Sequence, residues 1–181
     1  GMDITKSIEA CAQYYGDDAD AMRNYLIDGE TRALALDNRG PIQFDEEGNL
    51  SEAIKQAYSK YGFYIFENVL SDEELADVKA DLDAIRDIFP TDPESKVNHR
   101  GEPALGADNK ALNLVWSKPL GDPLGGTSLA NGRHEVKMFE PKAKADTPAA
   151  APFLLLGSLQ FSDACLRVYG HPQLLKVAEE I

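Results

Sequence analysis

Apolar residues recur at helical spacing in two segments near the start of the chain. Within residues 3–15 four of them stand three or four positions apart, at Ile4, Ile8, Cys11 and Tyr15. This spacing places their side chains on one face of a helix, which we expect to end at Gly16. The same pattern predicts a second helix over residues 18–28, with Gly29 as its end.

Residues 32–50 lack a clear helical period. The stretch RALALDNRGPIQF, residues 32–44, alternates loosely, and its Asn-Arg-Gly-Pro sequence at 38–41 is typical of a turn. A short extended segment is therefore predicted here. The acidic run DEEGNL at 45–50 is a second predicted turn. It lacks the alternating oxygen ligands of a calcium-binding loop, so no cation site is expected.

The pattern is clearest in residues 51–66. Ser51 stands at the N-cap position of a helix whose apolar residues share one face: Ile54, Ala57, Tyr58 and Tyr61. Gly62 is predicted to end this helix. The next four residues, Phe-Tyr-Ile-Phe at 63–66, are aromatic or β-branched and predict a short strand.

A long acidic helix follows this strand. Ser71 and Glu74 have the spacing of a capping box, in which the side chain of each accepts a hydrogen bond from the other's backbone N–H. The acidic residues 72–74 lie in the first turn, where the helix dipole favours negative charge. Pro90 ends the helix. Its buried stripe is predicted to consist of five apolar residues: Leu75, Val78, Leu82, Ile85 and Phe89.

Beyond Pro90 the pattern alternates between polar loops and short strands. Residues 91–110 are polar and include Gly101, Pro103 and Gly106, which predicts a long loop of the kind that often covers a functional site. Strands are predicted over 111–116 and 134–139, with a glycine-rich loop over 118–132 between them.

The end of the chain is predicted to be helical. Residues 153–170 read as one helix, and His171 opens another with Pro172 in its first turn. The sequence stops at Ile181 without a cap, a glycine or a tail. We therefore expect the fold to continue beyond this residue.

Composition and charge indicate one soluble domain, or a large part of one. The 181 residues are 43% hydrophobic and 27% charged. The sequence has neither an apolar run long enough to span a bilayer nor the pattern of a signal peptide. The two cysteines form no disulfide framework, which suits a reducing cytoplasm. The net charge is −13, and residues 1–90 hold 20 acidic and 8 basic side chains. This balance argues against a nucleic-acid partner. No membrane partner is expected either, because a spanning apolar run is missing.

Motifs for metal or nucleophilic chemistry are missing from the sequence. A mononuclear iron oxygenase needs two histidines and a carboxylate, with the local signature His-x-Asp or His-x-Glu. The residues two positions after His99, His134 and His171 are glycine, valine and glutamine. His134 and Glu135 are adjacent on a predicted strand and so point to opposite faces. Each histidine is therefore expected to be a surface or loop residue, and no metal ligand is predicted.

Two stretches nevertheless resemble one family. YGFYIFENVLSDEELADVKADLDAI, residues 61–85, is similar to the amino-terminal signature of the phytanoyl-CoA dioxygenase family. That signature has a helix ending in glycine, a short aromatic strand, an Asn-Val-Leu-Ser turn and a helix that begins Asp-Glu-Glu-Leu. YGHPQLLKVAEEI, residues 169–181, resembles the His-Pro helix that leads toward the oxygenase core in this family.

The resemblance implies a fold and an activity. Family members are non-haem iron(II), 2-oxoglutarate-dependent oxygenases, and they hydroxylate a small-molecule substrate on a double-stranded β-helix. We expect an α+β fold in which amino-terminal helices pack on part of such a jelly-roll, cupin-like core. Residues 1–50 are expected to be a helical extension, and residues 51–181 the amino-terminal part of the oxygenase domain. In the family the iron ligands and the 2-oxoglutarate-binding Arg follow the His-Pro helix, so residues 1–181 alone are expected to bind neither cofactor.

The same resemblance suggests three site residues. Lys137 stands where family members place a basic residue that contacts the cosubstrate. Asn113 and Trp116, on the predicted strand 111–116, are expected to line the substrate pocket. Plain structural roles remain open for each of them: Lys137 and Asn113 as exposed strand residues, and Trp116 as a core side chain.

Two other hypotheses remain open. A non-catalytic helical binding module would use the acidic helix 71–89 as its docking surface. A dimeric scaffold would pair through exposed strand edges, which an incomplete β-core leaves open. The open reading frame distinguishes the first of these from the oxygenase, because the oxygenase requires a His-x-Asp and a distant His downstream of Ile181.

Overall fold

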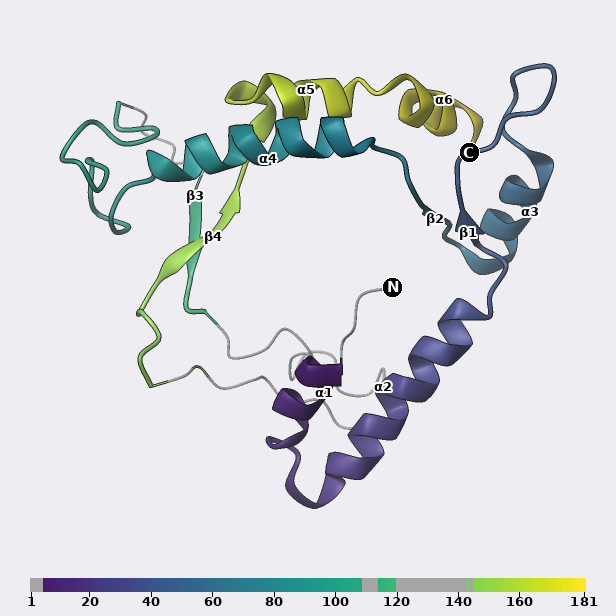
Figure 1. Cartoon of the computed structure of the whole chain (residues 1–181), viewed down its shortest axis with the longest axis horizontal. Helices are drawn as coiled ribbons and strands as arrows, with labels where there is room; N and C mark the ends of the chain where they lie inside the picture. The colour runs from purple at the N-terminus through teal and green to yellow at the C-terminus, as the bar shows by residue number, and fades with distance from the viewer. Residues whose placement is uncertain (1–4, 109–113, 120–142, 144) are drawn as a thin grey trace. The chain divides into compact units, whose positions relative to one another are not determined.

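The computed structural model of this protein describes residues 5–108, 114–119, 143 and 145–181 (Figure 1). The chain forms two compact units. The first contains Gly1–Leu36 and Ser117–Ala151, and the second contains Asp37–Trp116 and Pro152–Ile181. The sequence-based division into residues 1–50 and 51–181 is a different one and stays a prediction.

Two helices form the described core of the first unit. Helix α1 (Thr5–Ala12) is followed by the 3₁₀ helix η1 (Gly16–Asp18) and by helix α2 (Ala19–Leu34). Three buried side chains hold them together, and three partly buried ones pack around these: Ala12, Tyr15 and Met22, with Tyr14, Ala19 and Leu26. The predicted helix 3–15 is therefore confirmed in position but ends three residues earlier, and residues 3 and 4 lie outside the described part.

Helix α2 is longer than predicted, because Gly29 does not end it. The helix continues to Leu34, and the N–H of Ala35 still donates to the carbonyl of Thr31. A glycine inside a helix costs only about 1 kcal/mol relative to alanine. The residues after it, Glu-Thr-Arg-Ala-Leu at 30–34, are mostly good helix formers, and they carry the helix past the glycine. The extended segment predicted over 32–44 is thereby reduced to its second half.

A small parallel sheet opens the second unit. Strand β1 (Arg39–Gly40) pairs with strand β2 (Ile65–Phe66), in the register Arg39 with Ile65 and Gly40 with Phe66. The side chain of Asn38 is buried and donates to the carbonyl of Phe63 at 3.3 Å. The predicted strand 63–66 is thus present in its last two residues. The predicted turn at 45–50 is confirmed by a bridge between Phe44 and Leu50.

Helix α3 (Glu52–Tyr61) connects the two strands of this sheet. Its end is as predicted: Gly62 adopts the left-handed conformation, with φ of 81°, and its N–H donates to the carbonyl of Tyr58. Ser51 stands at the N-cap, but its side chain makes no capping hydrogen bond. On the predicted inner face Ile54 and Ala57 are buried, whereas Tyr58 is exposed.

Helix α4 (Asp72–Asp87) begins with the predicted capping box. The backbone N–H of Glu74 donates to Ser71 Oγ at 3.1 Å, and the N–H of Ser71 donates to Glu74 Oε2 at 2.7 Å. The predicted stripe is only partly buried: Ile85 is in the core, while Leu75 is 50% exposed. The other three residues of the stripe are partly buried: Val78, Leu82 and Phe89.

Residues 88–107 form the predicted loop, which folds back on the end of α4. A bridge joins Val97 to Pro103, and the N–H of Leu105 donates to the carbonyl of Ile88 at 2.8 Å. The side chain of Asn98 is buried, and its Oδ1 accepts from the N–H groups of Arg100 and Glu102.

The helix predicted over 153–170 is wrong in its first half and confirmed near its end. Strand β4 (Ala151–Leu155) occupies its start and pairs with strand β3 (Leu114–Ser117). The short 3₁₀ helix η3 (Ser158–Gln160) and helix α5 (Asp163–Tyr169) follow. Gly157 has a φ of 68°, which breaks the helical path, and Ser162 starts α5 as its N-cap.

Helix α6 (Pro172–Glu180) is confirmed, with Pro172 in its first turn. Of the strand predicted over 111–116, residues 111–113 lie outside the described part, as does all of the strand predicted over 134–139. The described residues form a mixed α+β fold with two small two-stranded sheets and no closed or curled sheet. No helix among them has the length and apolar character needed to cross a bilayer.

Candidate functional site

Only one of the three residues suggested for the site lies in the described part of the chain. Lys137 and Asn113 fall outside it, so their predicted roles stay predictions. Trp116 is half-buried on β3, beside Val115, which is 40% exposed. Its indole Nε1 is buried, and among the described residues it has no hydrogen-bond acceptor. Buried tryptophans usually pair this N–H, so the unpaired donor marks Trp116 as the described residue of most interest on this strand.

Trp116 is the only tryptophan of the chain, so its fluorescence reports on this position alone. We expect its emission maximum to lie at shorter wavelength than that of a solvated indole, because the ring is half-buried. The maximum should move to longer wavelength when urea unfolds the protein. Emission at the solvated wavelength in the folded protein, or equal acrylamide quenching before and after unfolding, would contradict the burial.

The described histidines lie at helix ends and loops. His99, in the loop after α4, is 60% exposed at its side chain, and its Nε2 is 2.9 Å from Asp87 Oδ1. Arg100 also pairs with Asp87 and with Glu102. His171 precedes α6, and His134 lies outside the described residues. Among the described residues, His, Cys, Asp and Glu do not gather in threes at any point that could hold a metal ion.

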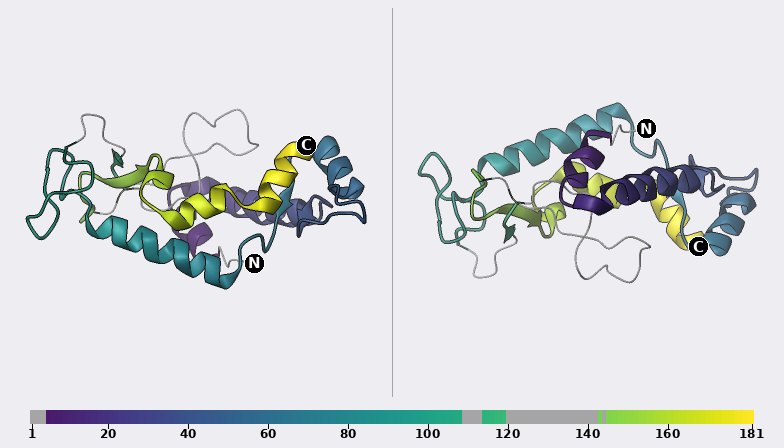
Figure 2. Two further views of the ribbon diagram at one scale, coloured as in Figure 1. Left: turned by 90° about the horizontal axis from the view of Figure 1, so that it is seen from above. Right: turned by 90° about the horizontal axis from the view of Figure 1, so that it is seen from below.

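The junction between α4 and α5 is a polar site that joins two helices of the second unit. The two helices lie side by side in Figures 1 and 2. Asp81 Oδ2, on α4, accepts from Ser162 Oγ at 2.7 Å and from the N–H of Ala164 at 3.2 Å. Ser162 Oγ in turn accepts from the N–H of Cys165 at 2.9 Å. A side chain of α4 and one of α5 thus cap α5 together.

This junction makes stability depend on pH. The hydrogen bond from Ser162, with that from the Ala164 N–H, lowers the pKa of Asp81. A carboxyl whose pKa is lowered on folding contributes stability that is present above its unfolded pKa, about 3.9, and is lost as the pH falls through the folded value. The urea midpoint should therefore fall on acidification to about pH 3, and less steeply in Asp81→Asn. Equal slopes in the two proteins would contradict this role of Asp81.

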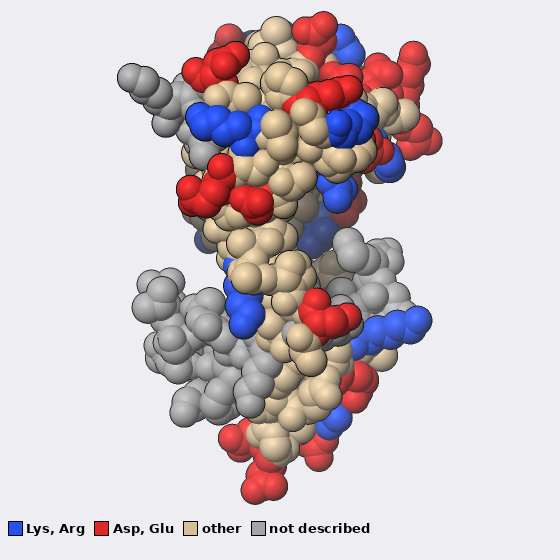
Figure 3. All heavy atoms as spheres, turned by 90° about the vertical axis from the view of Figure 1, so that its left-hand side faces the viewer, with Lys and Arg blue, Asp and Glu red and all other residues tan. Residues whose placement is uncertain are grey.

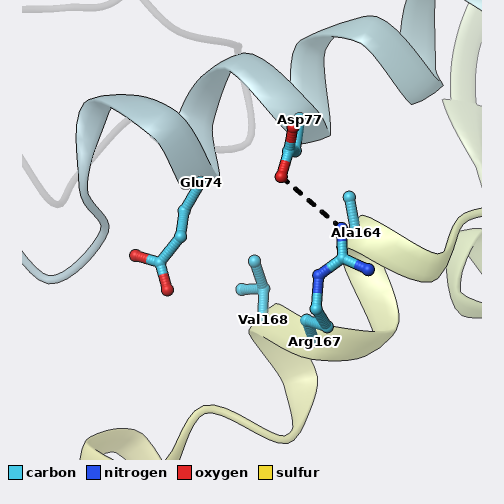
Figure 4. A pocket seen from close by; sticks show the side chains of 5 residues that line it. All are labelled: Glu74, Asp77, Ala164, Arg167 and Val168. Atoms are coloured by element: carbon cyan, nitrogen blue, oxygen red, sulfur yellow. Dashed lines mark ion pairs between the residues drawn. The ribbon is translucent and has the colours of Figure 1, made fainter.

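A small pocket of about 80 Å³ lies beside the junction. Figure 4 shows its lining: Glu74 and Asp77 from α4, and Ala164, Arg167 and Val168 from α5. Arg167 and Asp77 pair across it at 3.6 Å, with more than half of each side chain exposed. The volume suits water or a small ion, and it is far below that of a pocket for an organic substrate.

Sequence reasoning missed these polar groups. Ser162 followed by Asp163 and an apolar pattern has the form of a helix N-cap signal, so this residue could have been found. Nothing in the local sequence marks Asp81 as the partner of a serine 81 positions away.

The junction of α3 with α6 joins the two ends of the second unit. Leu50, Ile54 and Val177 form a buried cluster, and four partly buried residues in and next to the first sheet pack around it: Ile42, Phe44, Tyr64 and Phe66. Glu180 Oε2 accepts from the N–H of Leu50 at 2.6 Å and lies 3.4 Å from Lys55 Nζ. The backbone N–H of Leu50 lowers the pKa of Glu180, and Lys55 adds to this. The carboxylate of α6 therefore anchors the start of α3.

Charges are mixed on the surface that Figure 3 displays. Lys and Arg side chains of the described residues lie among Asp and Glu there and do not gather into a basic patch. That nucleic acid is not a partner stays a prediction.

Comparison of the chain with protein-family models, with curated proteins and with solved structures gives no match. The similarity to the phytanoyl-CoA dioxygenase family is therefore carried by the quoted residues alone.

Proposed function

We propose that this chain is the amino-terminal scaffold of an iron(II)- and 2-oxoglutarate-dependent oxygenase that resembles phytanoyl-CoA dioxygenase. One observation carries the proposal. The two stretches that resemble the family, residues 61–85 and 169–181, belong to one compact unit, and helix α6 of the second packs on helix α3, which ends where the first begins. Segments of one domain are expected to associate in this way.

The ends of the elements support the same reading. The glycine that ends α3, the capping box of α4 and the proline of α6 all adopt the conformations that their sequence signals specify. These signals make up much of the resemblance, and they have structural roles here. They support the fold of the scaffold more directly than they support its chemistry.

The surface of β4 and the residues after it supports an unfinished core. Large apolar side chains stand exposed there: Phe153 at 75%, Leu154 at 46%, Leu156 at 49%, Leu166 at 51% and Tyr169 at 70%. Large apolar side chains with this much exposure often lie against another part of a protein or a partner. In the proposal the remaining strands of a double-stranded β-helix cover it.

The described residues do not fit an iron ion, since His, Cys, Asp and Glu do not converge in threes among them. The proposal therefore assigns the iron ligands, and the Arg for 2-oxoglutarate, to sequence beyond residue 181. Lys137, Asn113 and Trp116 remain the residues of this chain proposed to face the cosubstrate and the small-molecule substrate. A cytoplasmic location is part of the same proposal.

Succinate formation tests this function. The longest protein that the gene encodes should convert 2-oxoglutarate to succinate in the presence of iron(II) and oxygen, because uncoupled turnover does not require the substrate. The 181-residue chain should produce none, and it serves as the matched control. A gene that ends at Ile181, or a longer protein without succinate formation, would contradict the proposal.

A binding module is the second candidate, and the exposure of α4 favours it. Only Ile85 of this helix is buried, and its first turn presents Asp72, Glu73 and Glu74. Such a surface suits a partner that combines apolar and basic side chains. A gene that ends at Ile181 would make this candidate the better account.

A further inference from the structure

His171 stands where three helices of the second unit meet. Its backbone N–H donates to the carbonyl of Val168 in α5, and its carbonyl accepts from the N–H of Leu175 in α6. Its side chain is only 12% exposed, and Nε2 lies 3.9 Å from Glu74 Oε1 in the first turn of α4. A side chain in this position contacts α4 while its backbone links α5 to α6.

The imidazole is the N-cap of α6. Its Nδ1 accepts a hydrogen bond from the backbone N–H of Gln173 at 3.3 Å. Only an unprotonated ring nitrogen can accept, so this bond requires a neutral imidazole with its proton on Nε2. In the protonated ring both nitrogens are donors, and the N–H of Gln173 loses its partner.

The charges around the ring decide what protonation does. The first turn of a helix disfavours a positive charge, so an imidazolium at the start of α6 is unfavourable there. Glu74 is the carboxylate that faces Nε2, and it is already held by the backbone N–H of Ser71, which lowers its pKa. The neighbouring pocket holds Asp77 and Arg167, which pair with each other. A protonated His171 therefore has Glu74 as its counter-ion.

We propose that His171 is a pH-sensitive joint between α4 and α6. Protonation breaks the cap of α6 and replaces it with an ion pair to Glu74, so the first turn of α6 loosens while the ring is held by α4. The consequence extends along the helix, because Val177 and Glu180 of α6 anchor the start of α3. This joint needs no iron and no substrate, so it is independent of the proposed function.

Amide hydrogen exchange of Gln173, followed by NMR in the 181-residue chain, tests the joint. The protection factor of this amide is compared between pH 8 and pH 5, and it should be lower at pH 5, where protonation of the ring would remove the acceptor. A loss of roughly threefold to thirtyfold is expected, which is the range that an N-cap bond provides. The matched variant is His171→Asn, because asparagine also caps helices but does not titrate. Its Gln173 protection should stay constant over the same interval.

A second variant tests the counter-ion. Glu74→Gln keeps the capping box with Ser71, because glutamine also serves in this motif, but it removes the charge that faces the imidazole. The pH at which Gln173 protection is lost should move lower in this variant. Constant protection in the wild-type chain, an equal loss in His171→Asn, or an unchanged midpoint in Glu74→Gln would each overturn the proposal.

Discussion

Replacing Leu50 by alanine is expected to lower the free energy of unfolding by about 2 to 5 kcal/mol, the range for large-to-small changes in a core. Leu50 is 1% exposed and packs against Ile54 and Val177, so its side chain holds α3 and α6 together. The loss combines the transfer of apolar surface to water with the cavity that remains. Urea unfolding followed by circular dichroism measures it.

Leu75→Ala is the matched control for this change. Leu75 is also a leucine of the second unit, but it is 50% exposed on α4. Surface substitutions usually change stability by about 0.5 kcal/mol or less, so the control should have a much smaller effect. Equal losses in the two variants would show that the cluster around Leu50 is not the core of this unit.

Ser162→Ala is expected to cost about 1 to 3 kcal/mol, because it removes a buried group that both donates and accepts. The hydroxyl accepts from the N–H of Cys165, and it donates to Asp81 of the neighbouring helix. Without it α5 loses its cap, and the contact between α4 and α5 loses its shortest hydrogen bond. The urea midpoint measures the change.

The control for Ser162 is Ser59→Ala. Ser59 is exposed on α3, and alanine is the better helix former there, so this change should be neutral or slightly stabilising. If both serine variants lost the same stability, the junction of α4 and α5 would not have the role that its hydrogen bonds indicate.

The elements that could be predicted carry their signals in adjacent residues. Gly62 ends α3, Ser71 and Glu74 begin α4, and Pro172 begins α6, each through contacts within a few positions of the chain. Capping chemistry of this kind acts locally, so the sequence alone is enough to locate it.

The elements that were mispredicted depend on distant partners or on weak signals. The apolar run at 153–156 suits a strand or a helix equally, and pairing with β3, far away in the sequence, makes it a strand. Gly29 was expected to end α2, but the cost of one glycine is small against the helix formers on either side. In both cases the local sequence pattern has less influence on the structure than the residues that surround the segment or pair with it.

The candidate site could be predicted less well than the fold. The sequence suggests Trp116 as a site residue, and its buried indole N–H has no acceptor among the described residues. The roles of Asp81 and His171 are not predicted, because each contacts a residue far away in the sequence, Ser162 or Glu74. Such pairs depend on how helices pack, which a single sequence does not specify.

Anaerobic titration with iron(II) in the presence of 2-oxoglutarate tests the central claim most directly. The ternary complex of such oxygenases is expected to give a weak visible charge-transfer band, and the titration compares the 181-residue chain with the longest protein that the gene encodes. The account predicts the band in the longer protein alone. A band in the 181-residue chain, or no band in either protein, would contradict it.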